Sequence, residues 1–252
     1  MSALYRLKRH PFEIEAKLHR SWVLTYAVPS EALVPLLKPG LTLDTFGDVG
    51  FFAVAMVQTE HLRLAGFPKV LGKSFFLAGY RLFVRYHTKA GRNLRGLQIL
   101  RSQTDSRLMV AAGSLFSHYG YERISADVEA EESEISVVVR RRGETILDVD
   151  GNLLRSTLPA DSVFSKESEA RRFEGPMPFT FDYEAETDSI LRIQGVREEW
   201  LPRLVEATVN VPPPFAEFGI DPELPNLASS FLLSDVPYRW KKGVVEPLLR
   251  TL

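Results

Sequence analysis

The chain has 252 residues, of which 45% are hydrophobic and 25% are charged, and its formal net charge is −1. This length and composition are typical of a globular protein with a substantial core. The near-zero charge argues against a nucleic acid or an anionic membrane as a partner. The absence of cysteine excludes disulfides, thiolate nucleophiles and cysteine-ligated metals, and it is compatible with a reducing cytosol.

The ends and linkers of the sequence suggest a simple organisation. The first twenty residues lack the long apolar core and the small-residue cleavage site of a secretory signal. No apolar run is long enough to cross a bilayer. Because the sequence shows no repeat and no low-complexity linker, we expect residues 1–252 to form a single cytoplasmic domain with no membrane partner.

The first half of the chain predicts a series of strands and a short helix. The predicted strands span residues 22–28, 41–46, 51–57, 81–88 and 94–103. Residues 51–57 (FFAVAMV) are apolar throughout, which indicates a strand buried on both faces. The short helix begins at Ser30 and ends at Pro39-Gly40. Residues 58–79 contain several glycines and a proline, and we predict a loop there.

A capped helix is predicted after the fifth strand. Thr104 or Asp105 serves as its N-cap, and its apolar stripe runs to about Ser117. Gly113 within it predicts close packing against a strand. Further strands are predicted at residues 124–132, 133–141, 144–150, 178–183, 189–194, 205–211 and 227–240. The polar residues 155–178 between them are predicted to form an exposed excursion. This pattern predicts a mainly β (α+β) antiparallel barrel or sandwich with a few helices.

Arg101 and Gln103 are the first candidate ligand contacts. Alternation from Leu97 and Ile99 places both side chains on one face of their strand. If that face lines a cavity, the forked donors of Arg101 suit a carboxylate. The alternative is that Arg101 pairs with an internal carboxylate or reaches solvent. A face of the preceding strand carries Arg81, Arg85 and His87. It is expected to meet solvent, and the alternative is that it faces a ligand.

The turn after the central helix holds the second group of candidates, His118, Tyr119, Tyr121 and Glu122. A histidine close to a glutamate suits acid–base chemistry, because histidine titrates near neutral pH. The alternative is a structural corner in which the tyrosine rings pack and their hydroxyls form hydrogen bonds.

Several other motifs do not predict a site. The five histidines show no close ligand spacing, so we expect no metal, and no cofactor motif is complete. Residues 66–74 (GFPKVLGKS) resemble a phosphate-binding loop but have one residue too many between the glycines. The basic run of residues 140–142 has acidic neighbours, which argues against nucleic-acid binding.

Two segments together carry a family resemblance. Residues 32–56 read ALVPLLKPGLTLDTFGDVGFFAVAM, a helix ending in Pro-Gly, a strand, and a strand closing in Ala-x-Met. This segment resembles the opening of the acetoacetate decarboxylase-like superfamily. Residues 111–121 (AAGSLFSHYGY) lie where that superfamily carries a small-residue helix and the following turn. The overall pattern is most similar to the DUF2071 (YqjF-like) branch of the superfamily.

The resemblance implies a closed antiparallel barrel around a partly apolar cavity. In the decarboxylases of this superfamily, a lysine in the cavity forms a Schiff base with a β-keto acid, and a neighbouring lysine lowers its pKa. Aligned on Gly113 and Tyr119, this lysine pair falls on Tyr121 and Glu122, neither of which forms an imine. Other nearby lysines are expected to be surface charges in loops and turns, namely Lys69, Lys73 and Lys89.

Two functional hypotheses share this cavity. The first is binding of a small anionic or partly apolar ligand, such as a carboxylate, without an imine. Its predicted contacts are Arg101, Gln103, Tyr119 and Tyr121. The second is an enzyme in which His118 or Glu122 moves a proton while Arg101 holds a carboxylate or an enolate.

A third hypothesis is an interaction protein that assembles into a homo-oligomer. Large apolar side chains exposed on a surface mark such interfaces. The candidate exposed aromatics are Phe164, Phe173 and Phe215.

Overall fold

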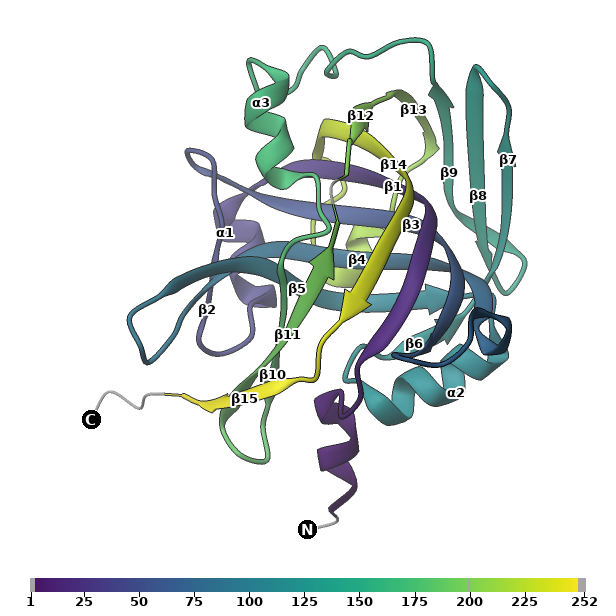
Figure 1. Cartoon of the computed structure of the whole chain (residues 1–252). Helices are drawn as coiled ribbons and strands as arrows, with labels where there is room; N and C mark the ends of the chain where they lie inside the picture. Colours follow the sequence, from purple (N-terminus) through teal and green to yellow (C-terminus); the bar gives the residue numbers. More distant parts are fainter. Residues whose placement is uncertain (1–2, 199, 249–252) are drawn as a thin grey trace.

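A computed structural model describes residues 3–198 and 200–248 (Figure 1). The strands in chain order are β1 (Ile14–Pro29), β2 (Leu41–Leu43), β3 (Val49–Leu64), β4 (Lys73–His87), β5 (Asn93–Thr104), β6 (Tyr121–Arg123), β7 (Ser125–Ala130), β8 (Glu134–Arg141), β9 (Glu144–Asn152), β10 (Phe179–Glu184), β11 (Ser189–Arg197), β12 (Arg203–Leu204), β13 (Glu206–Val211), β14 (Asn226–Trp240) and β15 (Val244–Pro247). The helices are α1 (Ser30–Leu33), α2 (Arg107–Phe116) and α3 (Glu167–Ala170), with 3₁₀ turns η1 (Ala3–Arg9), η2 (Val34–Leu36), η3 (Lys69–Leu71), η4 (Arg171–Phe173) and η5 (Phe215–Phe218). The fold is mainly β, as predicted. None of the helices in these ranges has the length and apolar character needed to span a bilayer.

The strands form two sheets. The larger has 11 strands, of which nine follow the order β12-β14-β1-β3-β4-β5-β10-β11-β15, while β2 pairs with β4 and β6 pairs with β5 off this path. An additional pairing between β11 and β14 joins distant members of this order. The smaller sheet has the order β13-β9-β8-β7. Figure 1 shows α2 beside η1, at the end of the large sheet away from α3.

The expectation of purely antiparallel pairing is wrong at two places. β5 pairs in parallel with β6, where Gln103 lies opposite Glu122. β5 also pairs in parallel with β10, where Leu97 lies opposite Thr180. The reason is connectivity, because parallel neighbours need a crossover rather than a hairpin. The segment containing α2 supplies that crossover between β5 and β6.

The prediction of a loop at residues 58–79 is also wrong over much of its length. β3 continues to Leu64 and β4 already begins at Lys73. Backbone pairing with β1 persists as far as Ile14 opposite Leu64. A sheet ladder needs only backbone donors and acceptors, so polar side chains can extend it beyond the core.

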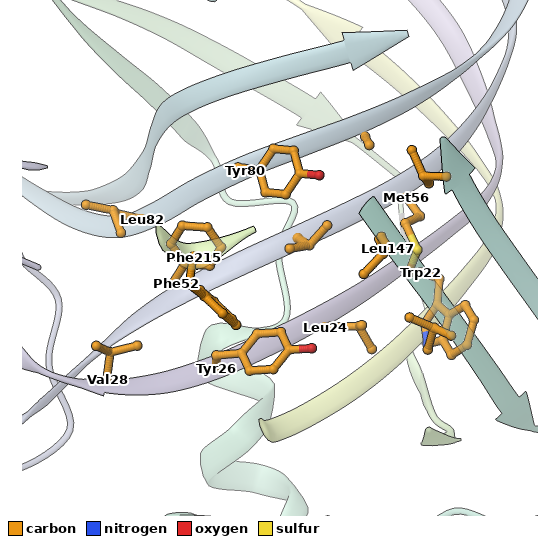
Figure 2. Packing of buried hydrophobic residues seen from close by; sticks show 14 of the residues in the cluster. Trp22, Leu24, Tyr26, Val28, Phe52, Met56, Tyr80, Leu82, Leu147 and Phe215 are labelled. Atoms are coloured by element: carbon orange, nitrogen blue, oxygen red, sulfur yellow. The ribbon is translucent and has the colours of Figure 1, made fainter. Parts of the chain in front are cut away.

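The large sheet has an outer face and an inner face. The outer face packs against the small sheet and η5, and Figure 2 shows labelled members of this cluster: Trp22, Leu24, Tyr26, Val28, Phe52, Met56, Tyr80, Leu82, Leu147 and Phe215. The inner face carries the alternate residues of the same strands, including Phe51, Val57 and Phe83. The prediction that residues 51–57 are buried on both faces is therefore confirmed.

Aromatic rings close part of the inner face. Phe173 lies 4.1 Å from Phe51 between ring centroids, and Phe164 stacks on Phe173 at 5.7 Å. Both come from residues 155–178, which were predicted to be exposed. Phe164 and Phe173 are 4% and 0% exposed, and Phe215 is 3% exposed, so the expectation that these aromatics are exposed is wrong. Assembly into a homo-oligomer stays a prediction. Their burial has a simple cause, since each ring removes apolar surface from water and anchors an otherwise polar segment.

Candidate functional site

A cavity of about 280 Å³ lies against the inner face of the large sheet. Side chains from β1, β3, β4, β5, β14 and α2 contribute to its wall. Its apolar wall includes Leu18, Val57, Leu77, Ile99, Phe116 and Met177. Its polar groups include His10, Arg81, Ser102, Tyr119, Tyr121 and Tyr238. An apolar pocket with a few convergent polar groups is the usual form of a small-molecule site.

Helix α2 forms one side of the cavity, and its start differs slightly from the prediction. Ser106 is the N-cap, with its hydroxyl oxygen accepting a hydrogen bond from the Met109 backbone N–H at 3.3 Å. Thr104 and Asp105, the predicted caps, instead bond the backbone of Phe76, at 2.8 Å each. These hydrogen bonds join the end of β5 to β4. Because α2 follows directly, they also fix the position of its first turn.

Gly113 brings α2 close to β6, as its position in the helix predicted. A Cβ atom at Gly113 would overlap the ring of Tyr121. The absence of a side chain at this point lets the Tyr121 ring lie flat against the helix and reach the cavity wall.

Arg81 is the unusual group of the cavity. Its side chain lines the cavity and is partly exposed. Burial lowers the pKa of its guanidinium to about 10. The group is still cationic at neutral pH. Its Nε is enclosed without a hydrogen-bond partner, and no hydrogen bond or salt bridge joins the Arg81 side chain to another described residue. A Cβ placed on Gly175 would lie 3.9 Å from the guanidinium carbon, so the guanidinium lies beside that backbone.

The tyrosines supply neutral hydroxyls. Burial raises the pKa of Tyr121 to about 12, and it raises those of Tyr119 and Tyr238 above their ordinary value. Their hydroxyls therefore stay protonated and can donate hydrogen bonds within the cavity. Tyr119 and Tyr121 were predicted as ligand contacts, and the structure places both on the cavity wall.

His10 adds a neutral ring to the same wall. Burial lowers its pKa, and its Nδ1 is enclosed without a hydrogen-bond partner. No glutamate, aspartate or lysine is among the described residues that line the cavity. Arg81 is thus the one group in this lining that is charged at neutral pH.

Arg101 does not lie in the cavity, and the prediction that it points there is wrong. The pairing of β4 with β5 is irregular, since Tyr80 lies opposite Arg101 whereas Arg81 lies opposite Ile99. The extra residue in β5 reverses the alternation, because a one-residue shift moves every later side chain to the other face. Ile99 and Ser102 line the cavity, and Arg101 faces outward.

On the outer face, Arg101 joins a charged network. Its Nη1 lies 2.5 Å from Oε2 of Glu217, and Nε2 of Gln103 donates to Oε2 of Glu122 at 3.1 Å. Hydrogen bonds from Arg141 and Arg101 hold the pKa of Glu217 at about 2. Arg101 therefore follows the alternative expectation, in which it pairs with a carboxylate of the same chain. Gln103 and Glu122 belong to the same cluster on the outer face.

His118 is not among the described residues that line the cavity, although Ser117 and Tyr119 on either side of it are. Burial lowers its pKa, and its electrostatic neighbours include Asp182 and Lys38. Asp182 also forms an ion pair with Lys38. No hydrogen bond or ion pair joins His118 to Glu122 in the described structure, so the predicted acid–base pair is not assembled.

The three lysines are surface charges, as predicted, but Lys73 belongs to a strand and not to a loop. Lys69, Lys73 and Lys89 are all exposed, in η3, at the start of β4 and in the turn after it. Among the described residues, no group of three or more histidines and carboxylates is arranged to hold a metal ion.

Comparisons with known proteins give a family match and several structures with a similar fold. A model of the DUF2071 family, described as an uncharacterized conserved protein, matches residues 15–228. No curated protein matches the sequence. The structure of acetoacetate decarboxylase from Legionella pneumophila is 11% identical, with 93% of this chain and 87% of that chain covered and a TM-score of 0.64.

Two further structures share the fold. The enduracididine biosynthesis enzyme MppR complexed with pyruvate is 10% identical, covering 93% of this chain and 90% of its own, with a TM-score of 0.60. An acetoacetate decarboxylase-like enzyme from Sphingomonas wittichii RW1 is 12% identical, covering 96% and 94%, with a TM-score of 0.59. At such low identity the similarity shows a common fold only. The function has to be inferred from the residues of the site itself.

Proposed function

This chain belongs to the DUF2071 family, and we propose that it binds a small carboxylate in its inner cavity without forming an imine. The proposal places the cavity inside a closed barrel. The strand pairings that run from β14 through β1, β3, β4, β5 and β10 to β11, together with the β11–β14 pairing, support this closure.

The unpaired Arg81 carries the proposal. An enclosed cation without a counter-ion is costly, and proteins normally pair such a group or let it lose its charge. Arg81 keeps its charge at neutral pH and has no carboxylate beside it in the described lining. A ligand carboxylate would supply the missing anion and accept two parallel hydrogen bonds from the guanidinium. The protonated hydroxyls of Tyr119 and Tyr121 offer further donors.

The absence of an imine is supported by the lining. The described wall contains no lysine, and Tyr121 stands on it at one of the two positions that the resemblance aligns with the lysine pair. Glu122, at the other position, faces the outer network. Acid–base catalysis by His118 or Glu122 has less support, since neither residue lines the cavity.

Calorimetric titration with hexanoate tests the proposal. Wild type is compared with Arg81→Gln, and Arg101→Gln is the matched control on the paired strand. Loss of charge-assisted hydrogen bonds predicts roughly 10- to 150-fold weaker binding for Arg81→Gln. The control should bind as wild type does. Equal affinity in all three proteins would overturn the proposal.

A second measurement addresses the imine directly. Borohydride treatment in the presence of pyruvate or acetoacetate would trap a Schiff base as a stable mass increase. We expect no adduct. A trapped adduct on any lysine of this chain would contradict binding without an imine.

A further inference from the structure

The cavity pairs a single charge with an apolar wall. Leu18, Val57, Leu77 and Ile99 belong to four different strands, and Phe116 belongs to α2. The apolar side chains therefore surround the cavity on several sides and do not form a single apolar patch. A ligand that fills it must bury apolar atoms of its own.

A second negative charge on the ligand has no partner in this wall. Arg81 is the one cation in the described lining, and burial keeps His10 neutral at neutral pH. The tyrosine hydroxyls can bond a second carboxylate but cannot neutralise it. Moving an ionised carboxylate from water into such a place costs several kcal/mol or more.

The size of the cavity limits the rest of the ligand. A volume of about 280 Å³ lies at the lower limit of typical small-molecule sites. It suits a ligand on the order of ten non-hydrogen atoms, well below the size of a nucleotide or a coenzyme A ester.

From these observations we infer that the ligand is a monocarboxylate with an apolar body, such as a medium-chain or aryl-alkyl acid. This inference rests on the proposed function and narrows it to a substrate class. The carboxylate lies against Arg81, and the apolar body lies against Ile99, Val57 and the α2 wall. Dicarboxylates and very short acids are poor ligands.

The test is calorimetry at neutral pH and constant ionic strength with four probes: octanoate, butyrate, suberate and 1-octanol. Each buried methylene contributes favourably, so octanoate should bind roughly tenfold to hundredfold tighter than butyrate. Suberate has the same chain length but two charges, and it should bind at least about tenfold more weakly than octanoate. Octanol lacks the anion and should also bind more weakly.

A cavity variant makes the test specific. Val57→Thr keeps the shape of the side chain but adds a hydroxyl to the apolar wall. It should reduce the affinity for octanoate more than the affinity for butyrate, with thermal unfolding as the check on folding.

The outcomes separate the two proposals. If butyrate or suberate binds as tightly as octanoate and still depends on Arg81, the proposed function stands and the inferred class is wrong. If none of the carboxylates binds, both are overturned.

Discussion

Arg81 and Arg101 lie on the paired strands β4 and β5, yet their side chains enter opposite faces of the sheet. The register irregularity beside Tyr80 and Ile99 separates them. Arg101 finds Glu217 on the outer face, and Arg81 is left in the cavity without a counter-ion. Both arginines lie in predicted strands, but Arg101 has a carboxylate partner and Arg81 has none in the described structure.

This difference predicts opposite effects on stability. Arg81→Met removes an unpaired buried cation, so it should raise the free energy of unfolding of the ligand-free protein by about 1–3 kcal/mol. Arg101→Met breaks an ion pair and should lower it by about 1 kcal/mol. Urea unfolding without added carboxylate measures both. A clear loss of stability in Arg81→Met would show that the guanidinium has a partner in the free protein.

Gly113 is predicted to set the position of Tyr121. Gly113→Ala should lower the free energy of unfolding by about 1–3 kcal/mol, because its Cβ overlaps the tyrosine ring. This loss outweighs the gain of about 1 kcal/mol that alanine brings to a helix. Thermal unfolding tests it, with Ser114→Ala on the exposed face of the same helix as the control. If Gly113→Ala were the more stable of the two variants, the close packing would be disproved.

Glu174 predicts a pH dependence. Burial raises its pKa to about 8, and its Oε2 has no hydrogen-bond partner. The folded protein therefore binds this proton more tightly than the unfolded chain does. Its contribution to stability is present below the ordinary glutamate pKa and is lost as the pH rises towards 8.

Glu174→Gln should remove that loss. The variant is expected to be more stable than wild type at pH 8.5, by roughly 1–3 kcal/mol, and closer to it at pH 5. Chemical unfolding at both pH values measures the difference, with the exposed Glu186→Gln as control. A pH profile identical to that of wild type would refute the raised pKa.

Glu217 predicts the opposite dependence. Its pKa is held at about 2, so its contribution to stability is present above the ordinary glutamate pKa and is lost as the pH falls towards 2. Glu217 is 35% exposed, which limits the effect of Glu217→Gln at neutral pH to about 1 kcal/mol. Wild type should therefore lose more stability than Glu217→Gln as the pH falls from neutral to about 2, and the stabilities of the two proteins should converge there. Identical acid titrations of the two proteins would contradict this.

Much of the fold follows from local sequence. The run at residues 51–57 and the alternating strands were predicted because their patterns are set by neighbouring residues. Tyr119 and Tyr121 were identified because they follow a recognisable helix. Arg101 was misplaced because the extra residue in β5 leaves no mark in the alternation of residues 97–103.

The remaining cavity residues depend on long-range pairing. His10 and Tyr238 come from opposite ends of the chain, and the pairing of β1 with β14 brings them to the same cavity. The sequence did contain an indication that Arg81 is enclosed. Phe83 lies on the same face of β4, and it is fully buried. An apolar neighbour on a supposed solvent face indicates that at least part of that face is enclosed.

A crystal structure with bound 6-bromohexanoate tests the central claim most directly. The account predicts anomalous density for bromine between Ile99 and α2, and the carboxylate within hydrogen-bonding distance of the Arg81 guanidinium. A carboxylate bound at Arg101 on the outer face, with the inner cavity empty, would contradict it.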